Sequence, residues 1–372
     1  MFLNSAGSSL TPKIVLKTMV DYLHQEEQFG GYETANRNSE IIQGFYDETA
    51  KLLNCKSSNI AFATSSTDAY AKALSSIPFK EEDCIITTDD DYISNQIAFI
   101  SLQKRLNIKV IRIKKNQDNE LDLEDLEDLI RKHQPKLIAV THIPTNSGLI
   151  QNVEGVGKIC RQHNILYLVD ACQSVGQMVV DVQKIECDFL TATGRKFMRG
   201  PRGTGFLYVS DRVLELGLVP LLLDLNGADW TEFDNYKIFK TAKRFEYWEI
   251  SYSSLLGFTE AVRYANQIGL NNIEEYNKKL AATLRTHLEN KGFRILDKGN
   301  NLSSIVTFCS KDGEIDSIQN ILKENNIYFS VSYKGGALID FSHKNIDKAV
   351  RLSPHYFNTV EEIEKVSQLL SN

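Results

Sequence analysis

Three polar motifs in this sequence could do chemistry, and each follows an apolar run. The residues from Thr64 to Asp68 offer hydroxyls and backbone N–H groups just before a helical stretch, as a phosphate cradle does. Asp170 needs a partner, because burying an unpaired charge is costly. Lys196 could form an imine with an aldehyde. Taken singly, each motif also fits a structural role: a helix cap, a turn cap and a solvated surface lysine.

A mostly parallel sheet would bring these motifs together. Between about residues 60 and 210, short apolar runs alternate with segments of helical spacing, which predicts strands flanked by helices. Ligands of such sheets bind at the carboxyl ends of the strands, where all three motifs stand. The chain between Asp170 and Lys196 is long enough for one crossover connection. The predicted strands are Asn59–Ala63, Cys84–Thr88, Lys109–Ile113, Leu137–His142, Leu166–Asp170, Phe189–Thr193 and Gly205–Val209, and helices between them include Asp68–Ser76, Leu123–Lys132 and Val153–His163.

Beyond about residue 255 the pattern changes to long helices and isolated strands. The helical stretches Leu255–Ile268 and Ile273–Asn290 come first, and a capping box at Thr359 opens the last helix. We therefore predict a large domain over residues 21–255 and a smaller α+β domain over residues 256–372. An N-terminal arm, residues 1–20, joins the small domain. The strands predicted in the small domain are Phe293–Leu296, Ser304–Cys309 and Tyr328–Ser332.

Composition narrows the class of protein. The net charge is −6 and no basic block occurs, so nucleic acid is not an expected partner. No apolar run approaches the roughly 18 residues of a membrane helix, and the first residues lack the pattern of a signal peptide. The six cysteines form no CxxC pair and no zinc-ligand spacing, which favours reduced thiols and no metal site. We therefore expect a cytoplasmic protein that acts on a small molecule.

The three motifs together match the needs of pyridoxal 5′-phosphate (PLP). This cofactor requires a lysine for its imine, an acid for its ring nitrogen and a nest for its phosphate. Lys196, Asp170 and the cradle after residue 63 supply these in order along the chain. The tight loop Gly200–Gly205 lacks the three-glycine spacing of a nucleotide site. We therefore predict that PLP is held on Lys196.

Over nearly its whole length the chain resembles the class V aminotransferase-fold PLP enzymes. This group includes cysteine desulfurases, selenocysteine lyases, kynureninases and isopenicillin N epimerase. The most specific stretches are Leu168–Gly176 and Thr193–Lys196. The resemblance implies PLP fold type I, with a mostly parallel seven-stranded sheet. It also implies a homodimer with active sites at the two-fold interface, where Arg244–Glu249 would reach the neighbouring site.

The resemblance implies a role for each matching residue. Lys196 would carry the cofactor and shuttle protons, and Asp170 would pair with the ring nitrogen. Gln173 and Thr145 would lie near the phenolic oxygen, and Tyr92 would stack on the ring. Ser66 and Thr67 would hold the phosphate, together with Thr193 and Arg195, and Arg351 would grip the substrate carboxylate as a bidentate fork.

A narrower likeness concerns the substrate. The stretch Gly30–Glu33 and the stretch from Arg195 to Gly205 are similar to hercynylcysteine sulfoxide lyases of ergothioneine synthesis, which assigns Tyr32 to substrate binding. Cysteine desulfurases carry a nucleophilic cysteine within the region that corresponds to Phe329–Val350, and this chain has none there. Ser330 also stands in place of an arginine seen in that subfamily. We therefore do not expect sulfur transfer through a persulfide.

The expected activity is β-elimination with cleavage of a C–S bond in a cysteine conjugate or sulfoxide, giving pyruvate and ammonia. Transamination and epimerisation of an amino acid remain alternatives, and a non-catalytic PLP-binding protein is the alternative outside enzymes. The pocket walls are expected on the loops Asn4–Ser9, Gly30–Asn36 and Asp224–Tyr236. Cys172 is interpreted as an inert thiol that fills space behind a buried strand.

Overall fold

A seven-stranded sheet forms the centre of the larger part of the molecule in the computed structural model, which describes residues 1–370. The strand order is β1-β7-β6-β5-β4-β2-β3. Only β7 runs antiparallel to its neighbours β6 and β1, so the sheet is mostly parallel as predicted. All seven predicted strands are confirmed: β1 (Ile60–Ala63), β2 (Cys84–Thr87), β3 (Lys109–Arg112), β4 (Leu137–Thr141), β5 (Leu166–Asp170), β6 (Phe189–Thr193) and β7 (Gly205–Val209).

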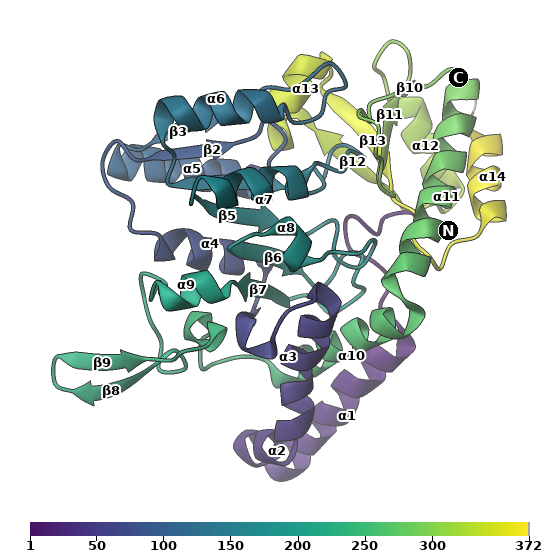
Figure 1. Ribbon diagram of the computed structural model, residues 1–372. Helices are drawn as coiled ribbons and strands as arrows, with labels where there is room; N and C mark the ends of the chain where they lie inside the picture. Colours follow the sequence, from purple (N-terminus) through teal and green to yellow (C-terminus); the bar gives the residue numbers. More distant parts are fainter. Residues whose placement is uncertain (371–372) are drawn as a thin grey trace.

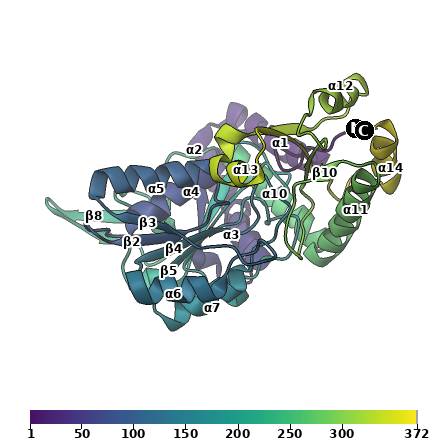
Figure 2. The same cartoon turned by 90° about the horizontal axis from the view of Figure 1, so that it is seen from above.

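Helices cover both faces of this sheet, as Figures 1 and 2 show. The central strands are buried along nearly their whole length because apolar side chains point to both faces. The helices on one face are α3 (Ser39–Leu53), α6 (Leu123–His133), α7 (Val153–Gln162), α8 (Val182–Ile185) and α10 (Tyr252–Ile268). Those on the other face are α4 (Ser66–Ser76), α5 (Ile93–Leu106) and α9 (Asp211–Glu215).

A second sheet with its own hydrophobic core follows in the chain, and we call residues 270–370 the C-terminal unit. Its strands are antiparallel in the order β10-β11-β13-β12. The predicted strands appear as β10, β11 and β12, and the capping box at Thr359 is confirmed. The unit contains α11 (Leu270–Asn290), β10 (Arg294–Ile295), β11 (Val306–Cys309), α12 (Asp316–Glu324), β12 (Ser330–Tyr333), α13 (Leu338–Lys344), β13 (Lys348–Leu352) and α14 (Val360–Leu369).

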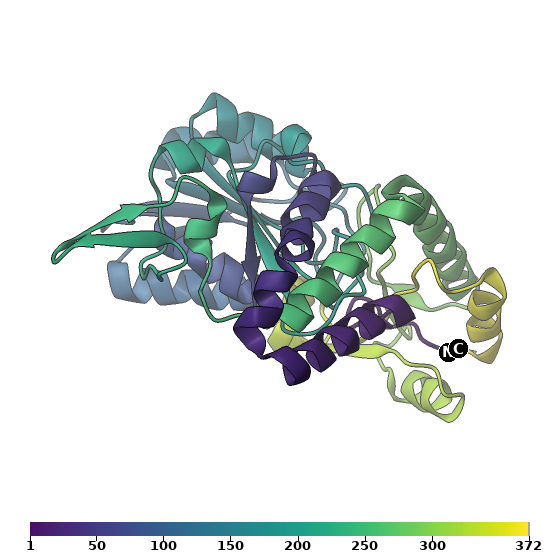
Figure 3. The same cartoon turned by 90° about the horizontal axis from the view of Figure 1, so that it is seen from below.

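The N-terminal residues connect the two sheets. Phe2 and Asn4 form bridges with Tyr328 and Ser353, and Leu3 is buried in the C-terminal core. Helix α1 (Lys13–Phe29) then packs along α10 (Figure 3). The domain limits at residues 20 and 255 stay a prediction.

Two segments expected as loops have regular structure instead, and a strand was missed. Residues 30–36 fall mostly within α2 (Gly31–Arg37). Most of residues 224–236 belong to a hairpin of β8 (Ala228–Glu232) and β9 (Asn235–Ile238), which projects from the body in Figures 1 and 3. Its two-residue turn, Phe233-Asp234, lacks the glycine that usually marks a hairpin. Strand β13 was missed because it is short and carries charged residues, although it lies inside the second sheet.

Two expectations from composition can be compared with the structure. The six cysteines are free: Cys84, Cys160, Cys187 and Cys309 are buried, and Cys55 and Cys172 are partly buried. Within residues 1–370, no helix combines the length and the apolar character that crossing a membrane requires.

Candidate active site

A cavity at the carboxyl ends of β4, β5 and β6 brings together all nine residues predicted to bind the cofactor. Each of these strands ends at the cavity, because parallel strands present their carboxyl ends at one edge of a sheet. Its lining consists of Ser65, Ser66, Thr67, Tyr92, Asn95, Thr141, Ile143, Thr145, Asp170, Cys172, Gln173, Thr193, Arg195 and Lys196. We call it the cofactor cavity.

Lys196 lies just after β6 and is buried at the floor of this cavity. Burial lowers the pKa of its amine, and the nearby Arg195 and Arg351 lower it further, although Cys172 and Asp170 act in the opposite direction. A lower pKa increases the fraction of neutral amine, which is the form that attacks an aldehyde. The amine lies 5.7 Å from the centre of the Tyr92 ring. A flat ring bound on Lys196 would therefore have Tyr92 beside it.

Asp170 ends β5 and is held by two donors. Its Oδ1 accepts a hydrogen bond from the backbone N–H of Cys172 at 3.0 Å. Its Oδ2 accepts one from Nδ2 of Asn95, on α5, at 3.0 Å. Two hydrogen bonds to one carboxylate fix its direction, as a partner for a protonated ring nitrogen requires. Sequence reasoning missed Asn95, although it stands three residues after Tyr92 in the same motif.

The N-terminus of α4 lines the cavity at the place where the phosphate is predicted to bind. Ser65 caps the helix, since its hydroxyl accepts from the backbone N–H of Asp68 at 3.1 Å. Ser66 donates to the hydroxyl of Thr191 at 3.0 Å, and Thr67 is exposed. At Gly205 a Cβ atom would lie 3.0 Å from the backbone nitrogen of Ser66, so only glycine lets β7 approach this turn. The exposed helix N-terminus suits an anion.

Thr145 links the cofactor cavity to the predicted substrate arginine. Its hydroxyl accepts from Nε2 of Gln173 at 2.8 Å and from Nη1 of Arg351 at 2.8 Å. Arg351 also donates to the carbonyl of Thr145 at 3.0 Å. Oε1 of Gln173 and Nε of Arg351 are buried without a protein partner among the described residues. Buried polar atoms are normally satisfied, so these two indicate a bound group.

A second cavity continues from the first, and we call it the substrate-side cavity. Arg195 and Lys196 line both cavities, and Arg351 lines the second. Within residues 1–370, none of the three cations forms an ion pair with a carboxylate at 4.0 Å or less. The lining consists of Ala6, Gly7, Tyr92, Ile93, Thr145, Asn146, Arg195, Lys196, Ser330, Val331, Ser332, Tyr333, Gly336 and Arg351, so only the first of the three predicted wall segments contributes.

The charge of this region fits an anionic ligand. Burial lowers the pKa of Arg351 to about 10, and the neighbouring Arg195 adds to the effect. An uncompensated buried cation destabilises the protein unless an anion binds beside it. PLP would bring a phosphate, and an amino acid would bring a carboxylate. The residues present therefore fit PLP together with an amino-acid substrate.

Two predicted contributions do not reach these cavities within one chain. Tyr32 lies on α2, is 72% exposed and lines neither cavity. In the segment Arg244–Glu249, the first three residues are buried in their own chain, where Glu246 accepts hydrogen bonds from the backbone N–H of Phe62 and the hydroxyl of Tyr46. Only the last three are exposed. The roles of both stay predictions.

Sequence reasoning also missed Asp91, directly before Tyr92. The carboxylate is buried and accepts from the backbone N–H of Thr141 at 2.7 Å and of Thr88 at 3.3 Å. Burial raises its pKa to about 7, although these hydrogen bonds oppose the rise. Asp91 therefore fixes the loop that presents Tyr92 to the cavity.

Comparisons with known proteins agree with this site. The family model described as aminotransferase class V matches residues 1–366. The chain is 29% identical to a probable cysteine desulfurase of Pyrococcus abyssi, over 98% of this chain and 92% of the relative. It is 27% identical to a probable cysteine desulfurase of Methanothermobacter thermautotrophicus, over 100% and 94%.

Solved structures show the same fold. The apo structure of a cysteine desulfurase from Thermococcus onnurineus superposes with a TM-score of 0.90 at 27% identity, covering 99% of this chain and 93% of that chain. A cystine C–S lyase in complex with its product cysteine persulfide superposes with a TM-score of 0.87 at 18% identity, covering 99% and 96%. The chain belongs to the class V aminotransferase family of fold type I, and its cofactor is pyridoxal 5′-phosphate.

Proposed function

We propose that this PLP-dependent, cysteine desulfurase-like enzyme cleaves the Cβ–S bond of a cysteine conjugate or sulfoxide by β-elimination. The products are pyruvate, ammonia and the released sulfur compound, and no sulfur is transferred to a cysteine of the enzyme. The relatives named as cysteine desulfurases support a sulfur-containing amino acid as the substrate. The proposal differs from desulfuration in the fate of the sulfur.

The observation that carries this proposal is the composition of the substrate-side cavity. Its outer wall is formed by β12 and the turn after it, and the lining residues there are Ser330, Val331, Ser332, Tyr333 and Gly336. No cysteine follows Cys309 in the sequence, and Cys309 is buried in the core of the C-terminal unit. A persulfide mechanism needs a thiolate within reach of the substrate sulfur. This wall offers hydroxyls and a phenol instead.

Cys172 is the only cysteine in the lining of either cavity. Burial raises the pKa of its thiol to about 12, and the neighbouring Asp170 adds to the rise. The thiolate is the nucleophilic form of cysteine, so a thiol with this pKa stays unreactive near neutral pH. Cys172 therefore supports the same conclusion as the cysteine-free wall.

Different residues around the two cavities have different roles in the elimination. Arg351 holds the substrate carboxylate, and its contact with Thr145 fixes the direction of the guanidinium. When bound, PLP supplies the electron sink for the Cα carbanion. Lys196 has a lowered pKa and serves as the base that removes the Cα proton. Asp170, which accepts a hydrogen bond from Asn95, would stabilise the positive charge on the ring nitrogen of PLP.

The products of turnover test this assignment. Purified enzyme is incubated with a cysteine S-conjugate and, separately, with cysteine, and pyruvate, ammonia and alanine are measured. We expect pyruvate and ammonia in equal amounts, because removal of sulfur to a thiol would instead leave alanine. Protein quenched during turnover is then analysed by mass spectrometry. Alanine as the main product, with one extra sulfur atom on Cys172 that a thiol reductant removes, would establish desulfuration instead.

We also propose that the enzyme is a homodimer. The β8–β9 hairpin projects from the body and exposes 78% of Trp230 and 95% of Phe233. A two-stranded hairpin is marginally stable by itself, and large exposed apolar groups mark interaction sites. A second copy of the chain would cover them. Sedimentation velocity should give a dimer, and an active monomer at micromolar concentration would contradict the proposal.

A further inference from the structure

A third cavity is lined by both parts of the molecule, and we call it the interunit cavity. Glu274 and Asn301 line it from the C-terminal unit, and the rest of its lining comes from the chain between residues 120 and 185. It shares no lining residue with the cofactor cavity or the substrate-side cavity. Its volume of about 420 Å³ lies within the range of small-molecule sites.

Two buried side chains in this lining have polar atoms without a partner. Gln151 is 2% exposed and His142 is 4% exposed. Oε1 of Gln151 and Nδ1 of His142 have no hydrogen-bond partner among the described residues. Buried polar atoms are normally hydrogen-bonded, so two unsatisfied atoms on side chains of one cavity indicate a bound group.

Both side chains can accept a hydrogen bond. Nε2 of Gln151 donates to the carbonyl of Thr141 at 2.8 Å, which orients the amide and leaves its oxygen as the unused acceptor. Burial lowers the pKa of His142 to about 4, so its ring is neutral at pH 7 and one ring nitrogen carries a lone pair. A ligand that donates hydrogen bonds would satisfy the amide and the ring.

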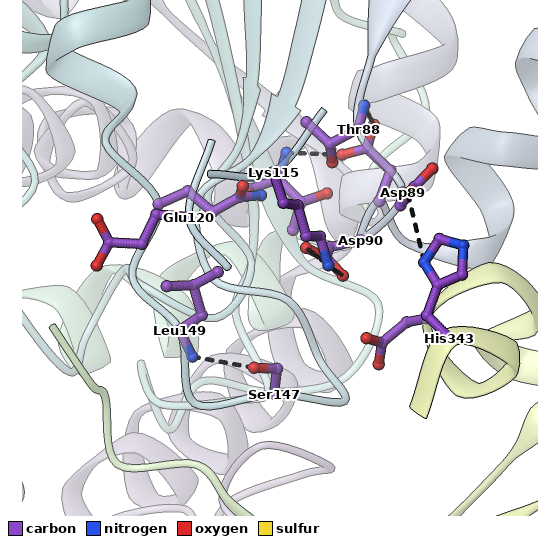
Figure 4. Close-up of polar contacts among 12 residues, drawn as sticks. Thr88, Asp89, Asp90, Lys115, Glu120, Ser147, Leu149 and His343 are labelled. Carbon is purple, nitrogen blue, oxygen red and sulfur yellow. Dashed lines mark hydrogen bonds and ion pairs between the residues drawn. The ribbon is translucent and has the colours of Figure 1, made fainter. Parts of the chain in front are cut away.

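Carboxylates around the cavity favour a cation. Glu120, Glu154 and Asp181 line it, and within residues 1–370 none of the three forms an ion pair at 4.0 Å or less. The neighbouring Lys115 pairs with Asp90 instead, at 2.8 Å, and the carboxylate of Glu120 points away from that pair (Figure 4). Uncompensated charges of one sign attract a ligand of the opposite sign.

Two further charged residues belong to the lining. Glu274 pairs with Lys278 at 2.8 Å and accepts from the backbone N–H of Val179 at 3.1 Å. Lys184 is exposed and is the single cation among the lining residues. The lining therefore has an excess of negative charge.

The arrangement suits an organic amine better than a metal ion. Within residues 1–370, no three His, Cys, Asp or Glu side chains are grouped closely enough to hold a metal ion. Apolar side chains of Ile150, Val153, Met178 and Ile185 lie in the same lining. A chain of methylene groups would contact these side chains, and an ammonium at each end would reach the acceptors and the carboxylates.

We propose that the interunit cavity is a binding site for a small aliphatic diamine. One ammonium donates to Gln151 and His142, and the other lies among the carboxylates described above. The site is separate from the chemistry of C–S bond cleavage and does not depend on the proposed function.

Isothermal titration calorimetry with putrescine, an aliphatic diamine, tests the site. The enzyme is first loaded with PLP and reduced with borohydride, so that an amine cannot react with the cofactor. We expect one putrescine to bind per chain, at least about tenfold more tightly than n-butylamine, because the monoamine lacks the second ammonium. Magnesium chloride should show no saturable binding. The proposal is overturned if putrescine shows no saturable binding, if the two amines bind equally, or if magnesium displaces putrescine.

Neighbouring residues on α11 provide a variant and its matched control. Glu274→Gln removes one charge from the lining and keeps an oxygen that can accept from Val179. Glu275→Gln removes an exposed charge one position away, outside the lining. Putrescine should bind Glu274→Gln at least about threefold more weakly and Glu275→Gln with unchanged affinity. Equal weakening in both variants would show general attraction to an acidic surface and would contradict a defined site.

Two more substitutions test the acceptors and the sign of the charge. His142→Phe removes both ring nitrogens and should weaken putrescine binding at least about tenfold, because hydrogen bonds to charged groups are among the stronger ones. Lys184→Met should tighten binding, because it removes the cation from the lining. Weaker binding to Lys184→Met would indicate a ligand with an anionic group and would exclude the diamine. The variants of Glu274 and Lys184 keep the test decisive if His142→Phe does not fold, and none of the measurements requires turnover.

Discussion

Replacing Arg351 by Met should cost the cofactor-free protein little stability while it damages substrate binding. Arg351 is buried on β13, and among residues 1–370 no carboxylate lies within ion-pair distance of it. A buried cation without an anionic partner lowers the stability of the folded state, and natural proteins retain such residues where function requires them. Met has a similar length and no charge, so the variant tests the charge with little change in packing.

The magnitude follows from the pKa of the guanidinium. Burial, with Arg195, lowers the pKa of Arg351 to about 10, well below its usual value. The charged side chain therefore costs the folded state about 3 kcal/mol. Because the folded pKa lies below the unfolded one, this cost is fully present below pH ~10 and is relieved as the pH rises through the unfolded value. The variant also loses two hydrogen bonds from the charged guanidinium to Thr145, at about 1.5–3 kcal/mol each. At the lower end of that range the two contributions cancel, so the net expectation at pH 7 is a free energy of unfolding close to that of the unaltered protein.

Arg285 provides the matched control, because it is buried beside a carboxylate. Its Nε lies 2.9 Å from the carboxylate of Asp297, and its Nη2 donates to the carbonyl of Ser303 at 2.8 Å. Arg285→Met would leave Asp297 buried without its cation, which costs about 3–5 kcal/mol. In urea denaturation of cofactor-free protein at pH 7, the midpoint should therefore stay close to that of the unaltered protein for Arg351→Met and move clearly down for Arg285→Met.

The effect of the substitution on kcat/KM is the second part of the test. Loss of a buried charged contact to the substrate carboxylate costs about 2–5 kcal/mol, and each ~1.4 kcal/mol is a tenfold change in kcat/KM. Arg351→Met should therefore lose at least about tenfold in kcat/KM while its folded state is undamaged. The reasoning is refuted if Arg351→Met is destabilised as strongly as Arg285→Met, or if it turns over substrate normally.

Three further substitutions test the cofactor cavity. The enzyme should be yellow, and borohydride should abolish its imine absorption and leave reduced PLP attached to Lys196. A Lys196→Ala variant that still traps PLP covalently on another lysine would show that the assignment is wrong. Asp170→Asn should keep the fold but slow turnover by several powers of ten, where each ~1.4 kcal/mol of barrier is tenfold, and near-normal turnover would exclude a role at the ring nitrogen. Cys172→Ala should keep most activity in a steady-state assay. In urea denaturation it should lose on the order of 1 kcal/mol of stability, because the substitution leaves a small cavity. A variant that folds but is inactive would contradict the interpretation of Cys172 as an inert thiol.

Contacts between distant parts of the chain escaped prediction. Sequence analysis assigned separate roles to Thr145 and Arg351, but their hydrogen bonds, across 206 residues, exist only because the C-terminal unit lies on the large sheet. Asn95 and Asp91 were missed although both flank Tyr92, since a polar residue on a helix or in a loop gives no sign of which buried partner it meets. Lys115 belongs to the same class, because its partner Asp90 stands 25 residues away along the chain.

Local sequence patterns were enough to predict the sheet, the cofactor and nine of the residues that line the cofactor cavity. Apolar strands buried on both faces leave a local pattern, and the side chains that follow them must meet at one edge of a parallel sheet, so Ser66, Asp170 and Lys196 were found from short motifs. The lining of the substrate-side cavity became visible only in the three-dimensional structure. This structure placed Tyr32 outside both cavities and Ser330 within the second, because that space lies between two separately packed units whose docking depends on non-local contacts that no periodicity records.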